Sequence, residues 1–328
     1  MSKPRIFITR SIFPEVIERL RGHFEVECNP SDEVMAPQEL AAALRDKQGV
    51  YCTPTERMSA EIIAACPDLK AICNMAVGHN NIDLDAATRA GIMVTNTPDV
   101  LNETTADFAW ALLLATARRV TESEHWLRAG KWDKWRIDTL LGVDVHGSTL
   151  GIIGMGRIGQ AIARRSMGFD MQVIYHNRSR LSPELEAKAN QARLVGKEEL
   201  LRSADHVILT LPYTAESHHT IGAAELALMK PTATLVNIAR GGIVDDAALI
   251  DALHAGRIAG AGIDVFENEP RFHPGFLGLS NVVLTPHLGS ASAPTRKAMA
   301  NCAADNLIAA LTAGTPPNIL NPQVQKKG

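Results

Sequence analysis

The feature that most constrains this chain is a glycine motif directly after an apolar run at 150–153. The motif reads Gly154-Met155-Gly156-Arg157-Ile158-Gly159. The apolar run predicts a buried strand and the residues after the motif follow a helical pattern, a context typical of dinucleotide-binding units. We expect Gly154 to make the tight turn, Gly156 to let the backbone approach a pyrophosphate, and Gly159 to let helix and strand pack closely. The anion would then lie at the positive end of the helix dipole.

The composition indicates an ordinary folded protein with room for about two domains. The chain has 328 residues, is 46% hydrophobic and contains 33 basic against 36 acidic residues, a balance that does not favour nucleic acid. No apolar run is long enough for a membrane span, and residues 2–5 lead into an apolar strand without a signal-peptide core. We therefore expect neither a nucleic-acid partner nor a membrane.

The cysteines and histidines predict a reduced protein without a metal site. Five cysteines are scattered without a CxxC pair, which favours free thiols in a reducing compartment, and we expect a cytoplasmic protein. The eleven histidines include His218-His219 but form no H-E-x-x-H motif, so we expect no metal ion.

Strand and helix signals alternate along the whole chain. In the first hundred residues, strands are expected at 5–9, 24–26, 49–52, 70–73 and 92–95, with helices at 14–20 and from residues 37, 59 and 83. After a long apolar helix at 102–119, strands are expected at 150–153, 171–175, 206–211, 234–239, 260–265 and 282–285. Further helices are expected from residues 157, 197, 223 and 245 and at 294–311. The pattern predicts an α/β protein with parallel sheets covered on both faces, the second a doubly wound dinucleotide fold.

Three residues able to do chemistry follow strands of the second half. They are Arg240, Glu269 and His287. Ligands of doubly wound sheets bind beyond the carboxyl ends of the strands, so all three are expected at the edge that carries the glycine loop. Taken singly, each has an ordinary explanation: a salt-bridge arginine, a solvated loop carboxylate and a loop histidine.

Together the three residues fit one reaction. A guanidinium can bind a small carboxylate through two parallel hydrogen bonds. An imidazolium can donate a proton to a carbonyl oxygen as hydride reaches the carbon, and a carboxylate behind it fixes its tautomer and favours its charged form. These groups are what the reduction of a 2-keto acid by a reduced nicotinamide requires.

Five motifs spread over much of the chain carry a specific resemblance. They lie at 151–159, 211–214, 237–245, 262–270 and 285–291. They resemble the D-isomer-specific 2-hydroxyacid dehydrogenases, and within that family chiefly the glyoxylate/hydroxypyruvate and 2-ketogluconate reductases. The resemblance implies NAD(P)H-dependent reduction of small 2-keto acids such as glyoxylate, hydroxypyruvate or 2-ketogluconate to D-2-hydroxy acids.

The resemblance also implies roles for individual residues. Arg240 would bind the substrate carboxylate, and His287, paired with Glu269, would donate the proton. Further substrate contacts would be the backbone N–H groups of Val77 and Gly78, together with Ser290 and Trp135. Beside the glycines, the expected cofactor contacts are Arg157, Ile158, Asn177, Arg178, Ser179, Arg180, Pro212, Ile238, Asp264 and Thr105.

In this family the cofactor domain interrupts the substrate domain. The resemblance therefore implies a flavodoxin-like substrate domain of residues 1–100 and 288–328 around a Rossmann-type cofactor domain of residues 101–287.

A tryptophan-rich segment follows the long helix. Three of the four tryptophans lie within 125–135, a composition that predicts packing onto the segment's own domain or a subunit interface. The resemblance implies a homodimer in which Trp135 reaches toward the partner's substrate cleft.

The residues after the second strand of the cofactor unit favour NADP. An NAD-specific fold places an acidic residue there for the ribose hydroxyls, but here the chain reads His176-Asn177-Arg178-Ser179-Arg180. No carboxylate would repel a 2′-phosphate, and Arg178, supported by Ser179 and Arg180, could bind it. The alternative is a solvated basic loop. We expect NADPH to be preferred, with NAD still possible.

Two other functions remain open. A phosphoglycerate-type dehydrogenase would use the same groups. A non-catalytic dinucleotide sensor on the same scaffold would keep the glycine loop but would not need the set of Arg240, Glu269 and His287.

Overall fold

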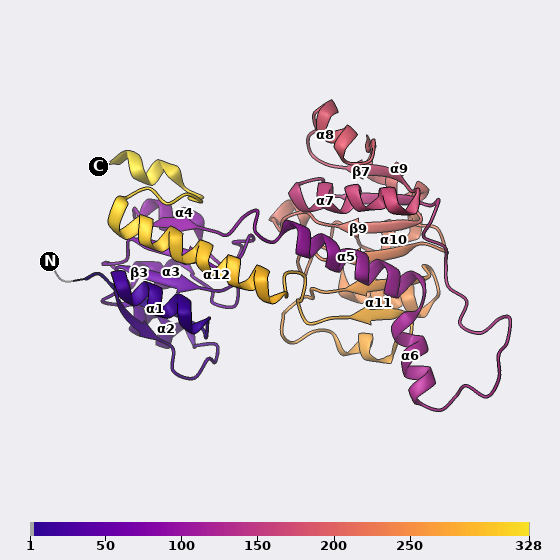
Figure 1. The fold of residues 1–328 in the computed structure, drawn as a ribbon, viewed down its shortest axis with the longest axis horizontal. Coiled ribbons are helices and arrows are strands. Elements are labelled where there is room, and N and C mark those ends of the chain that lie inside the picture. Colours follow the sequence, from indigo (N-terminus) through magenta and orange to yellow (C-terminus); the bar gives the residue numbers. More distant parts are fainter. Residues whose placement is uncertain (1–2, 328) are drawn as a thin grey trace. The chain divides into compact units, whose positions relative to one another are not determined.

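A computed structural model describes residues 3–327 and divides into two compact units. Unit 1 comprises Met1–Leu101 and Ser292–Gly328, and unit 2 comprises Asn102–Ala291. Each unit contains one parallel sheet with helices on both faces (Figure 1), which confirms the predicted fold class.

Unit 1 is built on a five-stranded sheet in the order β2-β1-β3-β4-β5, the flavodoxin-like order. Its strands are β1 (Arg5–Ile8), β2 (Glu25–Cys28), β3 (Gly49–Cys52), β4 (Ala71–Asn74) and β5 (Met93–Thr95). Its helices are α1 (Pro14–His23), α2 (Pro37–Leu44), α3 (Ala60–Ala64), α4 (Leu84–Arg89) and α12 (Ala293–Ile308). One face packs on α1 and α12, and the other on α2, α3 and α4. The central strands β3 and β4 are buried along their whole length, as parallel strands covered on both faces should be.

Unit 2 is built on a seven-stranded sheet in the order β12-β11-β10-β9-β6-β7-β8. Its strands are β6 (Thr149–Ile153), β7 (Gln172–His176), β8 (Arg193–Leu194), β9 (His206–Leu209), β10 (Thr234–Asn237), β11 (Gly260–Ile263) and β12 (Val282–Leu284). Its helices are α5 (Asn102–Ala117), α6 (Val120–Arg128), α7 (Arg157–Arg165), α8 (Pro183–Lys188), α9 (Lys197–Ser203), α10 (Ala223–Leu228) and α11 (Asp246–His254). The strand order reverses between β6 and β9, where such folds bind dinucleotides.

Two apolar cores hold unit 2 together. On one face of the sheet, α5 and α7 pack side by side (Figure 1). On the other face lie α9, α10 and α11, with Leu200, Leu226 and Leu249 buried against the strands. Asp245 caps α11 by accepting a hydrogen bond from the N–H of Ala248 at 3.0 Å.

The elements differ from the predictions in three places. The long helix ends at Ala117, because Arg119 adopts a left-handed φ of 53°, and a separate helix α6 follows. The short β8 and α8 were not predicted, so the sheet of unit 2 has a seventh strand. Unit 2 also extends to Ala291, because Asp264 binds the backbone N–H groups of Leu288 and Gly289.

Candidate active site

Three neighbouring strands of unit 2 end at one edge of the sheet. Arg240 comes soon after β10, Glu269 lies on the loop after β11, and His287 lies three residues beyond β12. Because these strands are adjacent and parallel, their carboxyl ends lie side by side. The sheet order therefore brings the three predicted catalytic residues together.

His287 and Glu269 form a hydrogen-bonded pair. Nδ1 of His287 lies 2.8 Å from Oε2 of Glu269, while Oε1 accepts the N–H of Phe266 at 2.8 Å. Burial would raise the pKa of the Glu269 carboxyl, but His287, the Phe266 N–H and the charge of Arg240 together hold that pKa below its ordinary value. Within residues 3–327, Nε2 of His287 has no hydrogen-bond partner. An ionised Glu269 thus leaves Nε2 as the position that can exchange a proton.

Asp264 holds the segment that carries His287. Its buried carboxylate accepts hydrogen bonds from Thr285 Oγ1 (2.7 Å), Leu288 N (2.7 Å) and Gly289 N (2.8 Å). Its carbonyl accepts the N–H of His287 at 2.9 Å. Burial raises the pKa of this carboxyl, and the accepted hydrogen bonds oppose the rise. The contacts hold His287 at its left-handed φ of 56°, which is uncommon for a residue other than glycine.

Arg240 is half-buried and has no acidic partner within salt-bridge distance among the described residues. Its Nη1 donates to the carbonyl of Ala239 at 2.7 Å, and its own carbonyl accepts Nδ2 of Asn237 at 3.3 Å. Burial lowers the pKa of the guanidinium, and the charge of Glu269 opposes this. The structure therefore does not support the salt-bridge explanation, and the guanidinium remains able to bind a carboxylate.

The backbone next to Arg240 touches the loop that carries Glu269. A Cβ built on Gly241 would overlap the carbonyl oxygen of Phe266 and come within 2.8 Å of the N–H of Glu267. Only a glycine permits so close an approach, so Gly241 sets the separation of the two segments.

The glycine loop has the shape expected of a pyrophosphate cradle. Gly154 has a φ of 98°, and a Cβ on it would lie 2.6 Å from the N–H of Leu211. A Cβ on Gly159 would overlap the carbonyl of Gly154, whereas the Cβ position of Gly156 is open. Gly156 is the N-cap of α7 and supplies no side-chain cap, so the helix N–H groups are left for an anion. These residues fit a dinucleotide.

The other predicted cofactor contacts belong to unit 2 as well. Arg157 and Ile158 open α7, and Pro212 and Ile238 follow β9 and β10. Thr105 is buried on α5, and its Cγ2 would lie 3.4 Å from a Cβ on Gly289. Their contacts with a cofactor, like that of Asp264, stay predictions.

The segment after β7 contains two arginines that differ in their contacts. Arg180 donates two hydrogen bonds of 2.9 Å to Glu186 on α8, whose carboxylate also accepts from Tyr175. Arg178 is exposed, and its side chain makes no hydrogen bond or ion pair with the described residues. Asn177 donates to the carbonyl of Ser179 at 2.9 Å. Arg180 is therefore engaged by Glu186. Arg178 forms no such bond among residues 3–327, although its charge helps to lower the pKa of the exposed Glu216 carboxyl.

Val77 and Gly78 lie in unit 1, on the loop after β4. Their carbonyls accept side-chain amides, Val77 from Asn96 and Gly78 from Asn74, both at 2.9 Å. Neither of their N–H groups has a partner among residues 3–327, which suits the predicted binding of a carboxylate. Ser290 is half-buried in unit 2, three residues after His287.

The tryptophan-rich segment does not pack onto unit 2 as a whole. Trp132 and Trp135 are 58% and 77% exposed, and Ile137 is 81% exposed. The segment runs from α6 through mostly irregular chain to β6 (Figure 1). The predicted packing of the segment onto its own domain is therefore wrong for these three side chains.

Sequence reasoning missed the supporting residues of the site. The clamp of Asp264 on the His287 segment and the contact of Gly241 with Phe266 join segments that are distant in sequence. A carboxylate placed directly after a buried strand was the available signal for Asp264. A search of the sequence for an H-E-x-x-H motif also could not find Glu267, which forms a hydrogen bond with His219.

None of the helices within residues 3–327 has both the length and the apolar character needed to cross a membrane.

Comparisons with known proteins agree with this site. The family model described as "D-isomer specific 2-hydroxyacid dehydrogenase, NAD binding domain" matches residues 110–289. A glyoxylate reductase of Thermococcus gammatolerans is 49% identical, over 99% of this chain and 98% of that protein. A solved glyoxylate reductase from Paecilomyes thermophila has a TM-score of 0.88 at 35% identity, over 98% of this chain and 100% of that one. An NADPH-dependent glyoxylate/hydroxypyruvate reductase from Sinorhizobium meliloti, solved with NADP and malonate, has a TM-score of 0.87 at 36% identity, over 97% of both chains. The chain therefore belongs to the family of D-isomer specific 2-hydroxyacid dehydrogenases.

Proposed function

We propose that this protein reduces small 2-keto acids, with glyoxylate and hydroxypyruvate as the first candidates and 2-ketogluconate as a third, to D-2-hydroxy acids. The observation that carries the proposal is the His287–Glu269 hydrogen bond beside Arg240, which has no acidic partner within salt-bridge distance among the described residues. The names of the relatives in Thermococcus gammatolerans, Paecilomyes thermophila and Sinorhizobium meliloti support the substrate class.

The side chains of unit 2 divide the chemistry between them. Arg240 binds the substrate carboxylate through its two-pronged guanidinium, and this orients the keto group. His287 donates the proton on Nε2 to the carbonyl oxygen as negative charge develops there. Glu269 accepts the Nδ1–H, which keeps the ring in orientation and stabilises its charged form.

The cofactor is held by Gly154, Gly156 and Gly159 at the start of α7. When bound, the reduced nicotinamide supplies the hydride. Arg178 binds the 2′-phosphate of NADPH. It is exposed and forms no salt bridge among the described residues, and no carboxylate stands at 177–180 to repel that phosphate, although the charge of Arg178 also reaches Glu216. Arg180 contributes less than its position in sequence suggests, because its guanidinium is shared with Glu186.

The remaining proposals concern assembly and location. The exposed Trp132 and Trp135 support a homodimer in which the tryptophan-rich segment covers the partner, and in which Trp135 shapes substrate choice. All five cysteines are free, three of them buried, which supports a reducing compartment, the cytoplasm.

The test is an oxidation assay of NADPH and of NADH with each keto acid. We expect turnover with glyoxylate and hydroxypyruvate, faster with NADPH, and loss of turnover in His287→Ala with nucleotide binding retained. Turnover restricted to phosphorylated hydroxypyruvate would favour the phosphoglycerate-type enzyme. Nucleotide binding without turnover of any keto acid would favour a sensor and overturn the proposal.

A further inference from the structure

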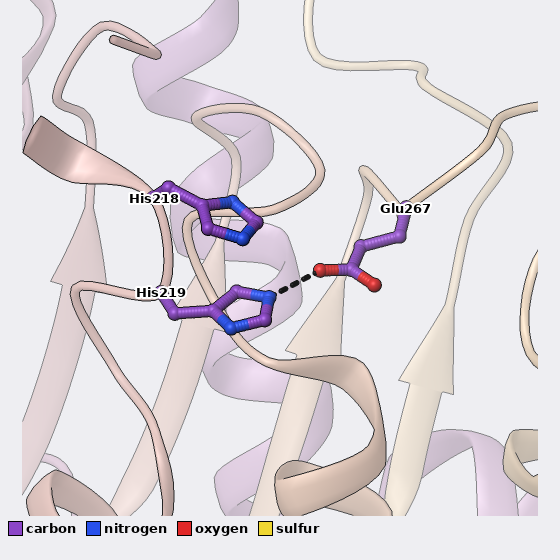
Figure 2. A group of neighbouring side chains, drawn as sticks. All are labelled: His218, His219 and Glu267. Carbon is purple, nitrogen blue, oxygen red and sulfur yellow. Dashed lines mark hydrogen bonds and ion pairs between the residues drawn. The ribbon is translucent and has the colours of Figure 1, made fainter. Parts of the chain in front are cut away.

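Two adjacent histidines and a glutamate from a distant loop meet on unit 2. His218 and His219 lie between β9 and α10, and Glu267 lies on the loop after β11 (Figure 2). The three offer two imidazole nitrogens and a carboxylate oxygen, all within 4.8 Å of one another. Separation by 48 residues explains why no ligand spacing was visible in the sequence.

The donor atoms lie close together. Nε2 of His219 lies 2.6 Å from Oε1 of Glu267. The rings of His218 and His219 stack with centroids 3.8 Å apart and an interplanar angle of 24°. Figure 2 shows both rings on the same side of the Glu267 carboxylate, each turning a nitrogen toward it. An ion that binds imidazole and carboxylate at about 2.0–2.2 Å would need only small side-chain movements to reach all three.

Each histidine also has a polar group behind its Nδ1. Nδ1 of His218 lies 3.2 Å from the hydroxyl of Tyr213, and Nδ1 of His219 lies 3.7 Å from Oδ2 of Asp245. Metal-bound histidines characteristically donate a hydrogen bond from the second ring nitrogen, because the outer partner fixes the ring and raises the basicity of the ligating nitrogen. The Tyr213 hydroxyl is within hydrogen-bond distance of His218, whereas Asp245 is near His219 but beyond it. A hydrogen bond between His219 and Glu267 alone would not require an oriented His218.

The backbone holds the cluster in place. The N–H of His219 donates to the carbonyl of Gly242 at 2.7 Å, and the N–H of Glu267 donates to Oδ2 of Asp246 at 3.1 Å. His218 is exposed, while His219 and Glu267 are partly buried. The site is thus ordered on the protein side and open on one side for an ion with water.

We propose that His218, His219 and Glu267 bind a divalent transition-metal ion of the Zn²⁺ type. Two imidazoles and one carboxylate suit zinc and its neighbours rather than Mg²⁺ or Ca²⁺, which prefer sets of oxygen ligands. Three protein ligands leave a fourth position for water. The three ligands are distinct from Arg240, Glu269 and His287, although Glu267 lies on the same loop as Glu269, and metal binding does not depend on the proposed reaction.

The test is a Zn²⁺ titration of the purified, reduced full-length protein by competition with a chromophoric chelator, repeated with Co²⁺ to record its absorption spectrum. The variants are His218→Ala, which removes an exposed ligand, and Glu267→Gln, which keeps the shape of the side chain and loses its charge. His125→Ala, an exposed histidine on α6, is the matched control. Thermal unfolding shows that each variant is folded.

We expect one Zn²⁺ per wild-type chain, an affinity lowered at least about 10-fold in His218→Ala and in Glu267→Gln, and no change in His125→Ala. Either of two results overturns the proposal: no stoichiometric binding by the wild type, or wild-type affinity in both ligand variants. The second result would mean that the His219–Glu267 hydrogen bond serves only to hold the loop after β11.

Discussion

Nδ1 of His287 and Oε2 of Glu269 lie 2.8 Å apart, on segments that follow the neighbouring strands β12 and β11. The carboxylate takes up one ring nitrogen and leaves the other, Nε2, without a partner among the described residues. The hydrogen bond therefore fixes the orientation of the ring and leaves Nε2 as the nitrogen available to a ligand.

Replacing His287 should stop proton donation. We expect His287→Ala to lower kcat by about 10²–10⁴-fold while the dissociation constant of NADPH hardly changes. Glu269→Gln should cause a smaller loss, because the amide can still accept the Nδ1–H but carries no charge. Steady-state kinetics and nucleotide titration measure both effects. A His287→Ala protein with near-wild-type kcat would rule out the assignment.

Replacing Arg178 should affect one cofactor only. Loss of a charge-assisted contact costs on the order of 1.5–3 kcal/mol, so Arg178→Ala should raise the KM for NADPH roughly 10–150-fold and leave that for NADH unchanged. Arg193→Ala, which removes an exposed arginine paired with Glu199, is the control. If both cofactors lose equally, Arg178 supports the fold and does not select NADP.

Gly241 should not tolerate a methyl group. In Gly241→Ala the new Cβ overlaps the carbonyl oxygen of Phe266, and we expect a loss of stability of about 1–3 kcal/mol together with lower turnover. Gly278→Ala, where a Cβ meets open space, is the matched control. Urea unfolding and steady-state kinetics of the two variants test this, and equal stability would contradict the close approach of the two backbones.

Buried His206 should make the stability depend on pH. Burial lowers the pKa of His206 below its ordinary value of 6.5. Its Nδ1 lies 2.8 Å from the hydroxyl of Thr234, and its Nε2 lies 3.1 Å from the backbone carbonyl of Asp144. The unfolded chain therefore binds a proton below about pH 6.5 that the folded chain resists, and stability falls as the pH drops.

The slope from this one group cannot exceed about 1.4 kcal/mol per pH unit. Unfolding by urea at pH 7.5, 6.5 and 5.5 should show a flatter pH dependence in His206→Gln than in the wild type. His125→Ala should keep the wild-type slope. Identical slopes in His206→Gln and the wild type would exclude His206 as the source.

The exposed tryptophans should report on assembly. We expect the wild type to be a dimer by light scattering, and Trp135→Ala to change the ranking of keto acids by kcat/KM because a large apolar contact is lost. Leu277→Ala, an exposed apolar residue outside the tryptophan-rich segment, should leave the ranking unchanged. A monomeric wild type would refute the proposed role of Trp135.

The strands, the helix starts and the residues at the carboxyl ends of the strands were predictable, because each depends on the pattern of neighbouring residues in the sequence. The starts of α7, α9 and α10 match the predicted residues, and Arg240 and His287 were identified by their position after apolar strands. The handedness of parallel connections then sets which face of the sheet each helix covers, and the strand order is that of doubly wound folds.

The missed features all depend on contacts between distant segments. The contact of Arg180 with Glu186 was not predictable, because α8, which carries Glu186, has too few residues for a clear helical period. The support that Arg180 gives to NADP binding stays a prediction. Asp264 and Glu267 were overlooked as supports because their partners lie 21–25 and 48 residues away. Such pairs become visible only once the strands are placed side by side.

The adjacency of β10, β11 and β12 has an evolutionary consequence. Arg240, Glu269 and His287 belong to one unit, and the loop of Val77 and Gly78 belongs to the other. On the proposed roles, a mutation in the unit 1 loop alters carboxylate binding and leaves the hydrogen-bonded pair of His287 and Glu269 unchanged. Changes in substrate binding and changes in proton transfer can then be inherited through mutations in different units.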